Sequence, residues 1–226
     1  ALSPFLPTFF ALIADPSVEV RRLAVKTFTF FINRAPALVC DLVPDLLPQL
    51  YDELPVKKEL IRELKLGIMT VKVDDAELNR KAALECFHVL VLVALDKINV
   101  HELVPKLMAG FGDRLTDNAI LCHTILTELA SLVPAALLEV VDALIKAFTK
   151  TLKDRPWSKA AKDVDAFAAL INATLRTIHT LHPLALAADS SGKWRAFEAS
   201  VAAGKWASQY AVVCGREVEA PAGASG

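Results

Sequence analysis

Apolar residues recur every three or four positions along most of this chain, which is the spacing of the buried face of an α-helix. In the segment 18–33 the apolar stripe consists of Val18, Leu23, Val25, Phe28 and Ile32. Asp15 and Pro16 precede it, and we expect Asp15 to be the N-cap and Pro16 the first helical residue. The same spacing predicts helices over 2–14, 37–52, 76–98, 100–113, 116–132, 135–152, 164–181 and 194–213.

The segment 57–75 departs from this pattern, because its apolar and polar residues alternate. From residue 64 to 73 the step is mostly two residues, which is the period of a β-strand. Gly67 lies near the middle, where a chain reversal can use its access to positive φ. We therefore expect a β-hairpin with its tip at Leu66–Met69. The alternative is a helix over 59–66 followed by a loop, with which the first arm is also compatible.

An internal repeat surrounds the predicted hairpin. The nine residues VRRLAVKTF at 20–28 align with NRKAALECF at 79–87, and a weaker copy, NAILCHTIL, begins at Asn118. The offsets are 59 and 39 residues, and a period of about 40 built from two antiparallel helices is typical of HEAT and armadillo repeats. The first offset is 20 residues longer than the second, and this excess falls on the hairpin segment.

These patterns predict an all-α fold, a HEAT-repeat α-solenoid with one inserted β-hairpin. Each helical pair cannot bury its apolar stripe alone, so neighbouring pairs are expected to stack into one continuous core. We expect a repeat array over 1–183 with the hairpin insertion at about 57–75, a capping helix region over 184–214 and a flexible tail over 215–226. Because the chain lacks an initial Met and starts inside a predicted helix, we expect it to belong to a longer protein.

Charge and hydropathy argue against several classes of function. The chain has 25 basic and 26 acidic residues, so no basic excess indicates binding to nucleic acid. Hydrophobic residues make up 54% of the chain, but uncharged runs within the array are about ten residues long, whereas a membrane-spanning helix needs about 20. The uncharged segment 1–14 has no basic start and contains Pro4 and Pro7, so we expect no signal peptide.

Residues that often carry chemistry do not form a recognisable active site. His179 and His182 can share a helix face, but no cysteine or carboxylate stands at ligand spacing beside them, so we expect no metal. Asp74 and Asp75 are expected to begin a helix rather than to form a catalytic pair. No nucleotide-binding, serine-hydrolase or zinc-protease motif occurs, so we expect neither an enzyme nor a cofactor.

Cysteines and paired basic residues have structural interpretations. Widely spaced cysteines predict buried free thiols in a cytosolic or nuclear protein rather than disulfides. They are Cys40, Cys86, Cys122 and Cys214. The pairs Arg21-Arg22 and Arg80-Lys81 could form a binding strip, but we favour contacts between successive repeats.

The stretch 33–100 resembles the C-terminal repeats, a TIP120-type domain, of the cullin-associated NEDD8-dissociated protein family. The resemblance rests on KKELIREL at 57–64, VDD at 73–75 and RKAALEC at 80–86. It continues more weakly through Leu181. The hairpin tip departs from the family, because it reads LGIMTVK where a turn resembling Gly-Pro-Phe is usual.

The resemblance implies a non-catalytic protein-binding function. A long HEAT solenoid would wrap an unneddylated cullin with its RING subunit, and this end would compete with the substrate-receptor adaptor at the cullin N-terminal region. It thereby implies substrate-receptor exchange on cullin-RING (SCF-type) ubiquitin ligases in the cytoplasm and nucleus, with no nucleic-acid, membrane or small-molecule partner. The residues expected to contact the partner are Arg62, Lys65, Leu66, Gly67, Ile68, Met69, Thr70 and Lys72. The alternative is a fragment of another HEAT-repeat scaffold or of a nuclear transport receptor.

Overall fold

The computed structural model describes residues 3–67 and 69–215, with only the backbone described for Ser3, Leu66 and Met69. It divides into two compact units, residues 1–128 and 129–226, of which the described parts are considered separately. The helices of the first unit are α1 (Leu6–Phe10), α2 (Val18–Arg34), α3 (Val43–Asp52), α4 (Glu77–Val93) and α5 (Val100–Gly110). Short 3₁₀ turns connect them: η1 (Ser3–Phe5), η2 (Ala11–Ala14), η3 (Pro36–Leu38), η4 (Cys40–Leu42), η5 (Lys58–Leu60) and η6 (Leu95–Lys97).

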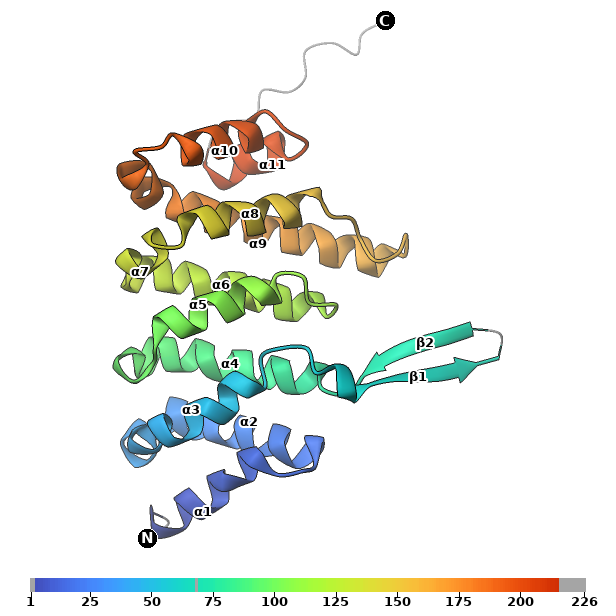
Figure 1. Ribbon diagram of the computed structural model, residues 1–226, viewed down its shortest axis with the longest axis vertical. Helices are drawn as coiled ribbons and strands as arrows, with labels where there is room; N and C mark the ends of the chain where they lie inside the picture. The colour runs from blue at the N-terminus through green and yellow to red at the C-terminus, as the bar shows by residue number, and fades with distance from the viewer. Residues whose placement is uncertain (1–2, 68, 216–226) are drawn as a thin grey trace, which may run out of the picture. The chain divides into compact units, whose positions relative to one another are not determined.

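The second unit is helical throughout its described residues. Helix α6 (Thr116–Leu132) contains the boundary between the units. It is followed by α7 (Pro134–Leu138), α8 (Val141–Lys153), α9 (Ala161–Ala188), α10 (Lys193–Ala202) and α11 (Ala207–Val213). Within each unit the helices pack in pairs, as Figure 1 shows. The predicted helical class, with paired HEAT-like helices and one inserted hairpin, is therefore confirmed.

The hairpin consists of β1 (Ile61–Leu66) and β2 (Met69–Asp74), which pair in an antiparallel two-stranded sheet. The alternative of a helix over 59–66 is wrong. Gly67 has a φ of 64°, which lies in the left-handed region that glycine enters without a steric penalty. The alternation of side chains and the single glycine were thus sufficient to locate this element.

An asparagine ladder joins successive helices of the first unit and explains the internal repeat. The side chain of Asn79 donates to the carbonyl of Val18 at the start of α2 at 2.9 Å. The side chain of Asn118 donates to the carbonyl of Glu77 at the start of α4 at 3.2 Å. Both asparagines are buried. The acceptors lie 59 residues apart and the donors 39 apart, so each of the two sequence offsets reappears in the ladder.

The core of the first unit lies between α2 and α4. Phe28 and Ile32 of α2 and Phe87 and Leu90 of α4 are fully buried. The ring of Tyr51 in α3 packs 4.8 Å from that of Phe87, so the third helix closes the same core. Fully burying each such side chain contributes about 1.5–3 kcal/mol, so stacking alone accounts for these apolar positions.

The start of α2 differs from the predicted one. Asp15 is extended with ψ of 144°, as an N-cap would be, but Ser17 is also extended, with ψ of 124°, so the helix begins only after Ser17. The carboxylate of Asp15 accepts from the backbone N–H of Ser17 at 2.8 Å, and the Ser17 hydroxyl caps the helix by accepting from Val20. The N-cap is therefore Ser17 and not Asp15, and the first helical residue is Val18.

Three helices near the C-terminal end also differ from their predicted ranges. Helix α9 continues through Pro183 to Ala188 although an internal proline costs about 3 kcal/mol. Leu181 and Ala185, on either side of that proline, are both buried, so continued packing offsets this cost. The helix predicted over 194–213 is instead α10 and α11, separated at a turn that contains Gly204. The helix predicted over 135–152 is likewise divided into α7 and α8.

Candidate functional site

The hairpin projects away from the helices of the first unit just before α4 (Figure 1). Its strands pair from Ile61 opposite Asp74 at the base to Leu66 opposite Met69 near the tip. Residues that stand opposite each other lie on the same face of an antiparallel pair, and successive residues alternate between faces. The pairing therefore assigns every hairpin residue to one of two faces.

One face of the hairpin is apolar. Leu64 lies opposite Val71, and Val73 lies opposite Arg62 nearer the base. Leu64 is 38% exposed, and the two-stranded sheet to which it belongs projects away from the helices (Figure 1). An exposed apolar face on a projecting element is a feature of protein–protein contact surfaces.

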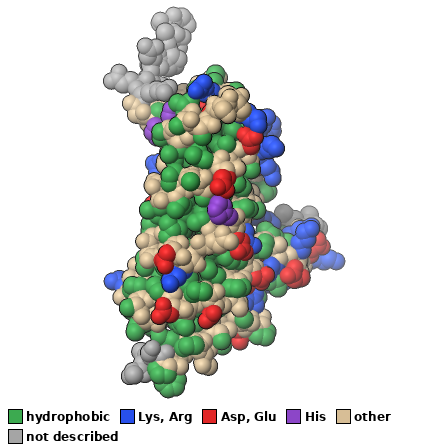
Figure 2. Space-filling model, turned by 60° about the vertical axis from the view of Figure 1, so that its left-hand side comes forward, with side chains coloured by type: hydrophobic (Ala, Val, Ile, Leu, Met, Phe, Trp, Pro, Cys, Tyr) green, Lys and Arg blue, Asp and Glu red, His purple; other side chains and the backbone are tan. Residues whose placement is uncertain are grey.

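The other face of the hairpin is polar. Glu63 lies opposite Lys72, and Lys65 lies opposite Thr70. The Nζ atom of Lys72 is 3.8 Å from a carboxylate oxygen of Glu63, and both side chains are more than half exposed. Such exposed pairs contribute little to stability, so these charges remain available to a partner. Figure 2 shows acidic and basic side chains next to each other on this projection.

A buried ion-pair network fixes the end of β2. Arg80 of α4 donates from Nε to Asp113 at 2.8 Å, and its Nη1 atom lies 2.8 Å from a carboxylate oxygen of Asp74. Burial alone would lower the pKa of Arg80, but the hydrogen bonds and charges of Asp113 and Asp74 outweigh it and raise that pKa. The last residue of β2 is thus tied to the turn between α5 and α6 through a cation that is only 2% exposed.

Further contacts close the base of the hairpin. Arg114 donates from Nη1 to the backbone carbonyl of Lys72 at 3.0 Å. Arg62 donates from Nε to the carboxylate of Asp75 at 3.0 Å, and the N–H of Asp75 donates to the carbonyl of Leu60 at 3.1 Å. Both strands are therefore held where they leave the helical unit.

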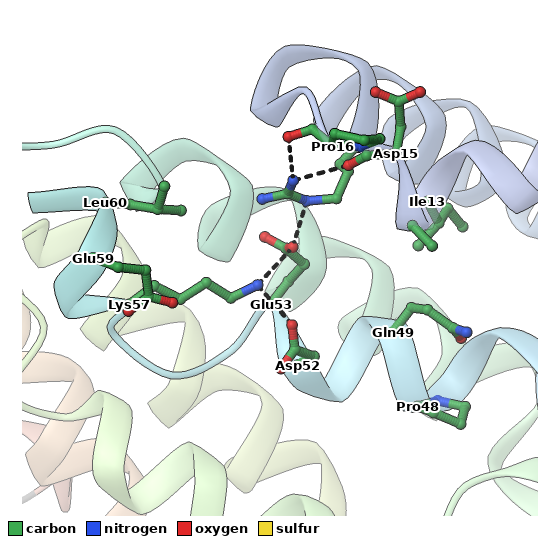
Figure 3. A pocket seen from close by; sticks show the side chains of 12 residues that line it. Ile13, Asp15, Pro16, Pro48, Gln49, Asp52, Glu53, Lys57, Glu59 and Leu60 are labelled. Carbon is green, nitrogen blue, oxygen red and sulfur yellow. Dashed lines mark hydrogen bonds and ion pairs between the residues drawn. The ribbon is translucent and has the colours of Figure 1, made fainter.

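A pocket of about 520 Å³ lies beside the entry to the hairpin, lined by α3, η5 and the loop before α2. Figure 3 shows Glu53 near its centre, with Lys57 reaching toward Glu53 and Asp52. Glu53 accepts from Arg21 at 2.7 Å and from Lys57 at 3.0 Å. Burial would lower the pKa of Lys57, but its hydrogen bonds to Asp52 and Glu53 raise it. These ion pairs hold residue 57, which is joined to the hairpin through η5, against α2 and α3.

The predicted contact residues belong to the hairpin, and part of its tip lies outside the described residues. Ile68 lies outside the described residues, and so do the side chains of Leu66 and Met69. The others belong to β1, the turn or β2: Arg62, Lys65, Gly67, Thr70 and Lys72. Leu64 and Val71 were missed as contact candidates, although their alternation with polar neighbours already placed them on one face. The anchor Arg114 had no sequence signal, because its acceptor is a backbone carbonyl 42 residues away.

Three of the four residues in the basic pairs have the structural role that was favoured. Arg21 and Arg80 bind carboxylates of neighbouring elements, and Lys81 binds Asp117 of α6 at 2.7 Å. Asp74 accepts from the N–H of Ala76 at 3.0 Å, but it is not the N-cap of α4, because Ala76 occupies that position.

Thiols and imidazoles give no metal site among the described residues. The four cysteines are free, as predicted, but only Cys86 and Cys122 are buried. Burial raises the pKa of Cys86 to about 12. His182 lies 2.7 Å from Glu198, and His179 lies 3.6 Å from the sulfur of Cys214, so both partners come from distant parts of the sequence. Within residues 3–67 and 69–215, no group of three or more His, Cys, Asp or Glu side chains is arranged to hold a metal ion. No helix in the same residues is long and apolar enough to cross a bilayer.

Paired helices with an anchored, projecting hairpin define a HEAT-like helical-repeat protein. Residues 38–202 match the TIP120 family, described as TATA-binding protein interacting (TIP20). The chain therefore belongs to the TIP120 family and is homologous to part of the cullin-associated NEDD8-dissociated proteins.

The relatives cover several kingdoms and are much longer than this chain. Cullin-associated NEDD8-dissociated protein 1 of Arabidopsis thaliana is 41% identical over 180 residues, which are 79% of this chain and 15% of that protein. The Drosophila melanogaster protein of the same name is 36% identical over 154 residues, which are 68% of this chain and 12% of the relative. In Emericella nidulans a protein named as the C-terminal part of cullin-associated NEDD8-dissociated protein 1 is 27% identical over 197 residues, 85% of this chain and 19% of its own length.

Proposed function

We propose that this chain is the adaptor-displacing end of a cullin-binding exchange factor for cullin-RING ubiquitin ligases. Its hairpin would occupy, on the N-terminal region of an unneddylated cullin, ground that the substrate-receptor adaptor also uses. The proposal rests above all on one observation, a hairpin that projects from a TIP120-family array and is anchored at its base. The names of the relatives, which associate them with cullins, support this choice over a nuclear transport receptor.

Anchoring makes the hairpin suitable for competition. A segment that orders only on binding loses conformational freedom, which reduces affinity, whereas a preorganised element avoids most of this cost. The contacts of Arg80 and Arg114 with β2 keep the hairpin in place before any partner arrives. A rigid element can therefore compete for a surface from which a flexible loop of the same sequence would be displaced.

The two faces of the hairpin would contribute differently to binding. Burying the apolar face around Leu64 and Val71 would supply most of the affinity, because hydrophobic contact area is the larger favourable term. Exposed charges such as Lys65 and Lys72 would mainly raise the association rate and make it sensitive to salt. Binding, and not bond chemistry, is the proposed activity, so it needs no cofactor. From the family resemblance we propose that it takes place in the cytoplasm and nucleus.

Competition of this kind is reciprocal. If the hairpin and the adaptor share part of the cullin surface, each lowers the affinity of the other by the same factor through a transient ternary complex. A bound adaptor would then leave faster in the presence of this chain, and this chain would leave faster in the presence of the adaptor.

Binding of the full chain to the N-terminal half of an unmodified cullin, followed by biolayer interferometry, tests the proposal. The double variant Leu64→Thr/Val71→Thr removes one apolar cross-strand pair and keeps strand-forming residues. We expect its affinity to fall by about tenfold or more, since losing the burial of two apolar side chains outweighs about 1.4 kcal/mol.

The matched control is Glu63→Thr/Lys72→Thr, which removes a cross-strand pair from the other face without changing the net charge. It should bind within about threefold of the unaltered chain, because exposed ion pairs contribute about 0–1 kcal/mol. Equal losses in the two variants would contradict the assignment of faces. Binding to a nuclear-transport GTPase but not to the cullin would favour the transport-receptor alternative.

A further inference from the structure

The second unit contains a pocket of about 360 Å³ between the last turn of α8 and the turn that joins α10 to α11. Its apolar lining comes from Leu152 of α8, Phe197 and Val201 of α10, and Trp206 at the start of α11. The pocket lies in residues 149–206 and therefore has no part in the hairpin site. A cavity of this size with apolar walls suits one or two side chains of a bound peptide.

The walls of the pocket are held in place by contacts within the unit. Trp206 donates from Nε1 to the carbonyl of Leu152 at 2.9 Å, which joins the two sides of the pocket. The ring of Phe167 in α9 packs behind Trp206 at a centroid distance of 6.2 Å. Gly204 lets the turn approach α10 closely, because a Cβ atom there would meet the carbonyl oxygen of Ser200 at 2.7 Å. The pocket is thus formed before a ligand enters it.

The charged residues that line this pocket are both basic. Lys153 and Lys205 stand at its edge, both exposed, and no aspartate or glutamate is among its lining residues. The Nζ atom of Lys205 lies 4.3 Å from the centroid of the Trp206 ring, which keeps the ammonium group over the apolar wall. Among the described residues neither lysine forms an ion pair with a carboxylate. By contrast, the pocket beside the hairpin has four acidic and two basic lining residues, and both basic residues pair with Asp52 or Glu53.

We propose that this pocket binds an acidic protein segment that inserts one large apolar side chain. The apolar group would lie between Phe197, Val201 and Trp206, while carboxylates on either side of it in the ligand would face Lys153 and Lys205. The two lysines favour an acidic ligand through charge complementarity. The apolar lining favours a peptide that carries an apolar residue over a plain polyanion. This surface is independent of the proposed cullin contact, so either can fail without the other.

Fluorescence polarisation with the full chain tests the site, using a labelled peptide Glu-Asp-Leu-Phe-Glu-Asp as the probe. One variant, Ser200→Trp, fills the pocket from an exposed lining position, and another, Lys153→Glu/Lys205→Glu, reverses the charge at its edge. Each should weaken binding by about tenfold or more. Ser200→Trp prevents the burial of the apolar side chain of the ligand, and Lys153→Glu/Lys205→Glu removes two charge pairs. A peptide with serine in place of Leu and Phe should bind equally weakly.

The charge control is Arg176→Glu. Arg176 lies nine residues after Phe167 in α9, which is two and a half helical turns, so the two side chains are on opposite faces of the helix. Arg176 is exposed and does not line the pocket, so binding of the probe should stay within about twofold. Circular dichroism of each variant confirms that the helices are retained. An equal loss in Arg176→Glu, full binding by Ser200→Trp, or equal binding of the serine peptide or of a single-stranded oligonucleotide would overturn the proposal.

Discussion

Replacing Arg80 by methionine removes the cation at the centre of the hairpin anchor. The side chains of Arg80, Asp113 and Asp74 are 2%, 4% and 13% exposed, so Asp113 would be left as a buried charge without its cation. Breaking a buried ion pair in this way typically costs about 3–5 kcal/mol. Asp113 would still accept from the N–H of Leu115 and from the side chain of Asn118, so we expect about 3 kcal/mol.

Arg21→Met provides the matched comparison within the same unit. Glu53 is also buried, at 3% exposure, but it keeps Lys57 at 3.0 Å after Arg21 is removed. Arg21 also donates to the backbone carbonyls of Asp15 and Pro16, but neither of these residues is buried, so water can replace those two bonds. The loss should therefore be mainly that of the hydrogen bond to the charged Glu53, about 1.5 kcal/mol. Urea unfolding followed by circular dichroism measures both values from the midpoint and slope.

A third variant separates the cost of a buried charge from that of lost packing. In Arg80→Met/Asp113→Asn a neutral amide replaces the uncompensated carboxylate. Part of the stability lost in Arg80→Met should therefore return. If Arg80→Met costs no more than Arg21→Met, or if the double variant is less stable than Arg80→Met, the ion pair is not the anchor described here. Loosening the anchor should also weaken cullin binding at temperatures where the helices remain folded.

Three further predictions test the packing of the first unit by urea unfolding. Gly110→Ala should cost about 1–3 kcal/mol, because its Cβ would lie 2.5 Å from the sulfur of Cys122. Adding Cys122→Ala should restore most of this loss, whereas Gly112→Ala, with no atom within 4 Å, should not show it. Burial lowers the pKa of His123 to about 3, so the unfolded chain takes up a proton that the folded chain excludes as pH falls below about 6.5. Stability should then fall by up to about 1.4 kcal/mol per pH unit between about pH 6.5 and 3, and His123→Leu should remove that part of the slope. Asn118→Ala should cost about 1–3 kcal/mol, because the carbonyl of Glu77 loses its donor. A stabilising Gly110→Ala, an unchanged pH slope in His123→Leu, or a neutral Asn118→Ala would each contradict these contacts.

The sequence was most informative where local pattern and local structure coincide. Alternation around Gly67 predicts the hairpin because strand period and turn chemistry both act over a few residues. Helical spacing predicts most helices for the same reason. The start of α2 was misplaced by two residues because Asp15 and Ser17 are both good caps, and the local pattern does not show that Ser17 is extended and lies outside the helix.

Features that depend on distant residues were not predictable from the pattern. Arg80 was expected to make a structural contact, but its partner Asp113 is 33 residues away and could be identified only from the packed helices. The continuation of α9 through Pro183 depends on packing at Leu181 and Ala185, which local helix propensity does not include. The two faces of the hairpin could have been derived, because the position of the turn alone sets which residues stand opposite each other.

The most direct test of the proposed function is the rate at which a labelled adaptor leaves an unneddylated cullin when this chain is added. The variant to compare has residues 64–71 replaced by a two-residue Asn-Gly turn, which shortens the hairpin, keeps Glu63 opposite Lys72 and leaves the anchored base. The proposal predicts that the full chain accelerates adaptor release and that the shortened chain, with unchanged helical content, does not. Equal acceleration by both chains would show that the hairpin has no part in displacement.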